Sequence, residues 1–168
     1  MKKNMITLAA LALMLIGFGC SSSDNDDDNQ VEAIVGSWIS QGDDVAPGLA
    51  GAPFNTARID AEFNENGTYE VISIDENDAQ VTFRGTYELG AETASGIRSI
   101  VLSQSEPVAV TSTGIFQVEG NRMTYEVIQT TPAIENFNPP TVEGGFGSTT
   151  FGTTPLGPTW TQYFNRNN

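Results

Sequence analysis

The sequence predicts an all-β fold over residues 31–168: a small, up-and-down antiparallel β-barrel of about eight strands. Three observations predict it. Apolar and polar residues alternate with a period of two along several segments, tight-turn residues separate consecutive segments, and no stretch after residue 30 shows a helical period. A two-sheet β-sandwich is the alternative architecture, because it also buries one apolar face of each strand.

The alternation is strictest in two segments. Residues 58–64 place Ile59, Ala61 and Phe63 on one face and polar residues on the other, and residues 80–89 follow the same pattern. Successive side chains of a strand point to opposite faces, so each segment is a strand with one buried face. The predicted strands are residues 34–40, 58–64, 68–74, 80–89, 97–104, 108–118, 122–129 and 160–165.

Tight turns join several of these strands. Asn66-Gly67 tolerates the positive φ of a hairpin turn, and residues 75–78 and 119–121 are similarly rich in turn-forming residues. Strands that follow one another through short turns pair antiparallel as neighbours. Because each strand has one apolar face, the sheet must close on itself or fold over.

Residues 130–158 do not fit a minimal barrel. This segment is rich in proline and small residues, yet it also contains Phe137, Phe146 and Phe151. Long loops without secondary structure are usually functional or disordered, and scattered phenylalanines argue against disorder. We therefore expect a loop packed over an open end of the barrel.

Residues 1–19 have the features of a signal peptide that is removed. Lys2 and Lys3 precede an apolar run that is shorter than the roughly 20 residues a membrane-spanning helix needs. Cys20 follows and is the only cysteine, so no internal disulfide can form. The segment resembles a bacterial lipobox, which implies cleavage before Cys20 and a lipid anchor, with acyl chains such as palmitate, on that residue.

Residues 20–30 are polar and acidic, and such a run cannot bury enough apolar surface to fold. We expect a flexible tether. The run also resembles the export signal of surface lipoproteins in the Bacteroidetes group. That resemblance implies a protein anchored by lipid to the outer membrane and exposed at the cell surface.

The residues after position 19 are strongly acidic: five arginines and no lysine stand against 21 acidic residues, a formal charge of −16. This balance leaves no basic patch for phosphate groups, so nucleic acid is not an expected partner. The sequence has no histidine, which excludes histidine-dependent catalysis and histidine-ligated zinc. We therefore predict a protein that is not an enzyme and uses no cofactor.

One acidic cluster has the oxygen ligands that calcium prefers. Residues 75–78 read Asp-Glu-Asn-Asp, but they lack the spacing and the central glycine of an EF-hand loop. A charged hairpin turn is the favoured interpretation, and no metal site is predicted.

Three short motifs resemble the lipocalin-like domains of bacterial lipoproteins. Gly36-Ser37-Trp38 is similar to the Gly-x-Trp opening of the lipocalins, and residues 63–69 and 85–87 are similar to later strand signatures of these domains. The resemblance implies an eight-stranded barrel in which Trp38 closes one end. It also implies a basic residue stacked on that tryptophan, for which Arg166 or Arg122 is available.

Aromatic residues at inward positions are the candidate ligand-binding residues. Phe83, Tyr87, Phe116 and Tyr125 either line a pocket or fill a narrow barrel, and the three phenylalanines of residues 130–158 would form a lid. The first reading predicts a module that binds a small apolar or amphipathic ligand. The second predicts a structural or protein-interaction module with a filled barrel, and the interior volume distinguishes the two.

Overall fold

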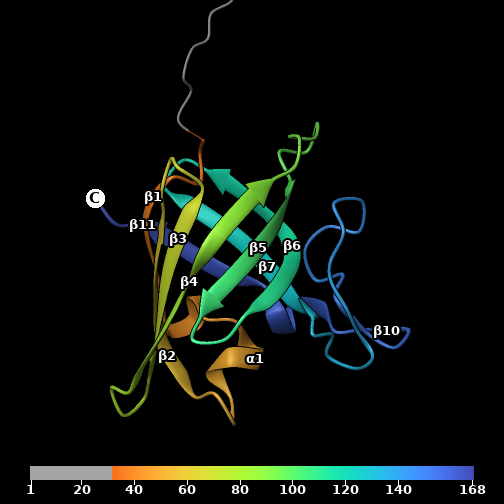
Figure 1. Cartoon of the computed structure of the whole chain (residues 1–168). Helices are drawn as coiled ribbons and strands as arrows, with labels where there is room; N and C mark the ends of the chain where they lie inside the picture. The colour runs from red at the N-terminus through yellow and green to blue at the C-terminus, as the bar shows by residue number, and fades with distance from the viewer. Residues whose placement is uncertain (1–31) are drawn as a thin grey trace, which may run out of the picture. The chain divides into compact units, whose positions relative to one another are not determined.

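The computed structural model describes residues 32–168, which lie in a compact unit of residues 31–168. Eight strands form the main sheet, and Figure 1 shows how they are arranged. They are β1 (Gly36–Gln41), β2 (Thr56–Phe63), β3 (Thr68–Asp75), β4 (Gln80–Leu89), β5 (Arg98–Glu106), β6 (Val110–Glu119), β7 (Arg122–Thr131) and β11 (Gln162–Arg166). The predicted signal peptide, the predicted tether and Cys20 lie outside the described residues.

The sheet is a closed barrel in which every strand is antiparallel to both neighbours. Strands β1 to β7 follow one another around the barrel, and β11 closes it between β7 and β1. This confirms the predicted all-β barrel, and the two-sheet sandwich is wrong. The alternating pattern specifies the register, because a shift of one residue would turn each apolar face outward.

Three further strands and three short helices lie outside the barrel wall. β8 (Phe137–Asn138), β9 (Thr150–Phe151) and β10 (Thr154–Pro155) form a small separate sheet; the helices are η1 (Gly42–Asp44), α1 (Pro47–Ala50) and η2 (Gly157–Trp160). The sequence predicted no secondary structure in residues 130–158. Two-residue strands are too short to produce a periodic pattern, which explains why the sequence does not reveal them.

The turns at the hairpins follow the predicted chemistry. Gly67 has a φ of +78° and Gly120 a φ of +60°, values that glycine adopts without steric cost. Asn66 supports its turn because its side-chain oxygen accepts hydrogen bonds from the amide (3.1 Å) and the hydroxyl (2.7 Å) of Thr68. In the acidic turn, the carboxylate of Asp75 accepts from the amides of Asn77 (2.8 Å) and Ala79 (2.9 Å).

Trp38 closes one end of the barrel. Its side chain is 0% exposed, and its indole N–H donates to the carbonyl of Ile34 at 2.7 Å. The guanidinium of Arg166 lies 4.2 Å from the ring centroid and donates to the carbonyls of Val35 and Ala33 at 2.9 and 2.8 Å. The predicted pairing of a closing tryptophan with Arg166 is therefore present in the structure.

Arg122, the alternative stacking residue, has a different role. Its guanidinium lies 4.8 Å from the ring of Tyr163 and forms an ion pair of 2.7 Å with Asp44. Hydrogen bonds to Arg122 hold the pKa of Asp44 below its usual value. This contact joins η1 to the outer face of the barrel.

Within residues 32–168, no helix combines the length and the apolar character that crossing a bilayer requires.

Candidate binding cavity

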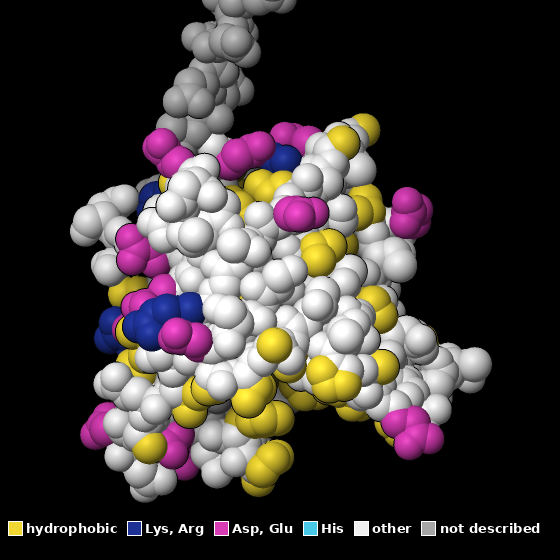
Figure 2. All heavy atoms as spheres, in the orientation of Figure 1, with side chains coloured by type: hydrophobic (Ala, Val, Ile, Leu, Met, Phe, Trp, Pro, Cys, Tyr) yellow, Lys and Arg dark blue, Asp and Glu magenta, His cyan; other side chains and the backbone are white. Residues whose placement is uncertain are grey.

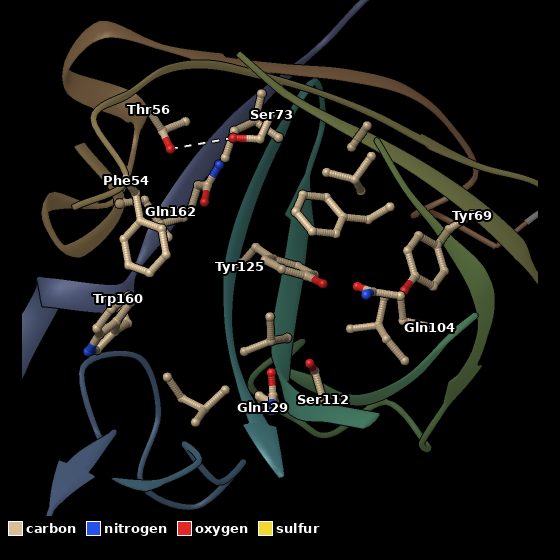
Figure 3. A pocket seen from close by; sticks show the side chains of 18 of the residues that line it. Phe54, Thr56, Tyr69, Ser73, Gln104, Ser112, Tyr125, Gln129, Trp160 and Gln162 are labelled. Carbon is tan, nitrogen blue, oxygen red and sulfur yellow. Dashed lines mark hydrogen bonds between the residues drawn. The ribbon is translucent and has the colours of Figure 1, made fainter. Parts of the chain in front are cut away.

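The barrel interior is filled at one end and hollow at the other. At the filled end, Phe63 and Tyr87 pack edge to face with ring centroids 5.3 Å apart, close to the layer formed by Trp38. The hydroxyl of Tyr87 donates to the carbonyl of Asn64 at 2.7 Å, and Arg98 lies over the ring of Phe116. The remaining interior is a cavity of about 580 Å³ (Figure 3).

The cavity wall is made by the inward positions of the alternating strands. Residues two apart on β2, such as Ile59 and Ala61, face the same side, and the same rule applies to Val71 on β3 and to Val127 on β7. The apolar wall residues from the barrel are Ile59, Ala61, Phe63, Tyr69, Val71, Phe83, Leu102, Tyr125, Val127, Ile128 and Phe164. This size and this lining are typical of small-molecule sites, which usually enclose about 300–1,000 Å³.

Residues from outside the main sheet complete the cavity at its open end. They are Leu49 on α1, Pro53 and Phe54 after it, and Ile134, Phe137 and Trp160 from the segment between β7 and β11. Phe137 packs edge to face against Trp160, with ring centroids 5.9 Å apart. α1 approaches η2 so closely that a Cβ atom on Gly48 would lie 2.9 Å from the indole of Trp160.

The open end also exposes apolar surface. Phe54 is 53% exposed, and Ile134 and Val108 are similarly accessible. Figure 2 shows hydrophobic side chains gathered along the lower edge of the molecule, the side on which α1 lies in Figure 1. The exposed Phe54 and Ile134 also belong to the cavity lining, so apolar surface continues from the interior to the rim.

Six polar side chains also line the cavity: Thr56, Ser73, Gln104, Ser112, Gln129 and Gln162. Some of them are already paired within the protein. The amide nitrogen of Gln104 donates to the carbonyl of Val108 at 2.9 Å, and that of Gln129 donates to the carbonyl of Pro132 at 2.7 Å. The amide nitrogen of Gln162, in contrast, is buried and has no hydrogen-bond partner among residues 32–168.

Two tyrosine hydroxyls face the cavity. Figure 3 shows the hydroxyl of Tyr125 projecting into the interior toward Tyr69 and Gln104. Neither tyrosine hydroxyl forms a hydrogen bond within the described part of the chain, unlike that of Tyr87. Burial raises the pKa of Tyr125 far above its usual value and raises that of Tyr69 to about 12, so both groups keep their protons at neutral pH.

The predicted ligand-binding residues divide into two groups. Phe83, Tyr125 and Phe137 line the cavity. The other four do not: Tyr87 and Phe116 fill the closed part of the core, and Phe146 and Phe151 lie outside the lining. Phe151 is 49% exposed, and its ring centroid lies 5.4 Å from that of Phe137. Phe151 therefore contacts a cavity residue without lining the cavity itself.

The segment between β7 and β11 is therefore only in part a lid. Ile134, Phe137 and Trp160 reach the cavity, whereas residues 145–149 pack on the outer face of β7. The contact is centred on Glu126, which is 0% exposed. Because Tyr125 and Val127 line the interior, the intervening Glu126 points outward, beneath this segment.

Glu126 holds the covering segment through four hydrogen bonds. Its carboxylate accepts from the amides of Gly147 (2.6 Å) and Thr149 (3.2 Å), and from the hydroxyls of Thr149 (2.5 Å) and Thr161 (2.8 Å). Sequence reasoning missed this residue, because a single acid at an outward position of a strand is normally exposed to solvent. The one indication in the sequence is the long segment of residues 130–158 that follows this strand, because such a segment needs a polar contact to pack on a sheet.

No charged side chain lines the cavity. The arginines are all outside it, where four of them form ion pairs: Arg58 with Asp60 (2.7 Å), Arg84 with Glu70 (2.5 Å) and Glu106 (3.0 Å), Arg98 with Glu32, and Arg122 with Asp44. Within residues 32–168, no group of three or more acidic or cysteine side chains is arranged to hold a metal ion.

No protein-family model matches this chain, and no curated protein or solved structure shows significant similarity to it.

Proposed function

We propose that this barrel is the binding module of a lipid-tethered surface protein and that it carries a small apolar or amphipathic molecule in its interior. The observation that supports this most strongly is the cavity of about 580 Å³, whose wall is built from aromatic and aliphatic side chains. Burial of apolar surface contributes about 25 cal/mol per Å², so a ligand that fills such a cavity gains affinity without any charged contact.

The rival hypothesis is a structural or interaction module with a solid barrel. It requires the inward aromatic side chains to meet across the barrel axis. Phe63 on β2 and Tyr87 on β4 pack together on one wall at the closed end, while Phe83 and Tyr125 line the cavity. The retained cavity therefore favours the carrier over the solid module.

The proposed tether, residues 20–30, precedes the described part of the chain. Glu32 lies at the closed end, where it pairs with Arg98, and the open end with α1 lies on the opposite side of the barrel (Figure 1). The described part of the chain thus begins at the closed end, opposite the mouth of the cavity.

The resemblance to lipocalin-like domains supports the same role. It was inferred from short motifs, of which Gly36-Ser37-Trp38 is the most specific, and it carries the expectation of a barrel closed by a tryptophan and a basic residue. The contact between Trp38 and Arg166 has that form. We propose that the chain is a lipocalin-like carrier on this basis.

A substitution that fills the cavity tests the proposal. Ser112 lines the cavity on β6, and Ser103, on the adjacent strand β5, is exposed and lies outside it. We expect residues 20–168 to bind the neutral fluorophore N-phenyl-1-naphthylamine and Ser112→Phe to weaken that binding at least about tenfold, a loss of about 1.4 kcal/mol. The matched variant Ser103→Phe should bind as the wild type does.

Fluorescence titration provides the measurement, and urea unfolding verifies that both variants are folded. These residues suffice for the test because every strand and the whole buried core of the barrel come from residues 34–166. Unchanged affinity in Ser112→Phe, or equal losses in the two variants, would place the probe outside the barrel and contradict the proposal.

A further inference from the structure

We infer that the occupant of this cavity is electrically neutral: an apolar molecule with one hydrogen-bonding group, such as an alcohol, a ketone or an ester. The inference rests on the proposed function and names the class of ligand. It follows from the charges that the cavity lacks and from the polar groups that it leaves unpaired.

A negatively charged ligand would find no partner inside the barrel. The lining contains no arginine, and the chain has no histidine and no lysine after Lys3. The transfer of an unpaired carboxylate from water into an apolar interior is strongly unfavourable. A cavity selective for fatty acids or other anions would need a cation that the lining does not supply.

No arginine is free to turn inward. Four arginines are engaged in ion pairs, of which that of Arg98 lies at the closed end, and Arg166 is fixed between the ring of Trp38 and two backbone carbonyls. The formal charge of −16 after residue 19 also repels anions as they approach. Anions are thus disfavoured both on the way to the cavity and within it.

A positively charged ligand lacks a partner as well. No carboxylate lines the cavity, and Glu126, the buried acid of β7, faces outward with both oxygens engaged. The aromatic wall could attract a cation through its ring faces, an interaction worth about 0.5–2 kcal/mol. That gain is small beside the cost of removing an unpaired ammonium group from water.

The unpaired polar groups of the cavity are neutral and include hydrogen-bond donors. Tyr125 and Gln162 are directly opposite each other on β7 and β11, so their side chains share the inner face. Gln162 is 5% exposed, and its amide nitrogen is buried without a hydrogen-bond partner among the described residues. The hydroxyl of Tyr125 opens onto the cavity. Leaving the buried Gln162 donor without an acceptor costs about 1–3 kcal/mol, and a ligand oxygen would remove that cost.

The hydroxyl of Tyr125 keeps its proton and therefore remains a hydrogen-bond donor. Burial raises the pKa of this hydroxyl, so it cannot become a phenolate that would attract a cation at physiological pH. Figure 3 shows the hydroxyl directed into the cavity toward Tyr69, which is on β3, and Gln104, which is on β5. A hydroxyl, carbonyl or ester oxygen of the ligand is the acceptor that matches it.

Two fluorophores with the same aromatic frame test the exclusion of anions. N-phenyl-1-naphthylamine is neutral, and 8-anilino-1-naphthalenesulfonate adds one sulfonate to it. We expect the sulfonate to bind residues 20–168 at least about tenfold more weakly than the neutral compound, counting only the signal that Ser112→Phe abolishes. If neither compound binds, the proposed function fails. If the sulfonate binds as tightly as the neutral compound, the inference is overturned while the proposed function stands.

Displacement of the neutral fluorophore tests the head group. 1-Decanol, decanoate and decyltrimethylammonium carry the same chain with a neutral, a negative and a positive end. We expect 1-decanol to displace the fluorophore at concentrations at least about tenfold lower than either ion. Equal displacement by decanoate or by decyltrimethylammonium would overturn the inference.

The role of Tyr125 can be tested by removing one oxygen atom. Tyr125→Phe should weaken 1-decanol binding about fivefold, as expected for one lost neutral hydrogen bond, and should leave N-phenyl-1-naphthylamine binding unchanged. Tyr163→Phe is the matched control, because Tyr163 is the neighbour of Gln162 on β11 and stacks on Arg122 outside the cavity. Equal 1-decanol affinity in Tyr125→Phe and Tyr163→Phe would overturn the assignment of Tyr125 as the donor.

Discussion

Replacement of Trp38 by alanine should lower the free energy of unfolding by about 3–5 kcal/mol, the range observed when a buried aromatic side chain is removed from a core. The side chain is completely buried, and its loss would also leave the carbonyl of Ile34 without its donor and remove the ring on which Arg166 stacks. Denaturant unfolding of residues 20–168 measures the change.

Trp160→Ala is the matched control for that experiment. It removes the same side chain from the open end, where Trp160 is partly exposed and its N–H has no partner among the described residues. We expect a clearly smaller loss of stability than for Trp38→Ala. A loss below about 1 kcal/mol for Trp38→Ala, or a larger loss at Trp160, would show that Trp38 does not close the barrel.

Replacement of Glu126 by alanine should lower the free energy of unfolding by about 2–4 kcal/mol. Hydrogen bonds to a charged group contribute about 1.5–3 kcal/mol, and buried donors left without a partner add a further cost. Thr149 and Thr161 are both buried, and their hydroxyls would be two of those donors. The effect should be local as well as global, because the carboxylate joins residues 145–149 to β7.

Hydrogen exchange separates the local effect from the global one. In Glu126→Ala, the amides of Gly147 and Thr149 should exchange much faster, whereas those of β2 and β3 should change only as far as global stability requires. Glu119→Ala provides the control, since Glu119 is an exposed acid at the end of β6 and should alter stability by no more than about 0.5 kcal/mol. If Glu126→Ala is as mild as Glu119→Ala, the carboxylate does not anchor this segment.

The barrel could be predicted from the sequence because the decisive information is local. Residues 58–64 alternate without exception and are followed by Asn66-Gly67, so strand, face and turn are all specified within a few positions. The position of Trp38 against Arg166 was anticipated from the motif resemblance. Strand ends agree with the prediction to within a few residues for the same reason.

The cavity could not be predicted in the same way. Phe83 and Tyr87 occupy equivalent inward positions on β4, and Phe116 and Tyr125 are paired on β6 and β7, yet one residue of each pair lines the cavity and the other fills the core. The difference lies in the height of each side chain along the barrel axis and in the direction that it takes. Periodicity gives the face of a strand and not these quantities.

The docked segment was hidden from sequence analysis for another reason. Its strands are two residues long, and its main anchor is Glu126, which is about 20 residues earlier in the chain than Gly147 and Thr149. Long-range polar contacts of this kind leave no periodic pattern. Of the three phenylalanines expected in the lid, only Phe137 lines the cavity.

The most direct test of the central claim is to locate a bound apolar molecule by methyl NMR. With N-phenyl-1-naphthylamine added to residues 20–168, the account predicts shifted methyl signals for Val71 and Val127, which line the cavity. The signals of Val101 and Ile115, which lie outside the lining on β5 and β6, should stay in place. Shifts at Val101 and Ile115 with Val71 and Val127 unchanged would contradict the claim that this barrel binds its ligand inside.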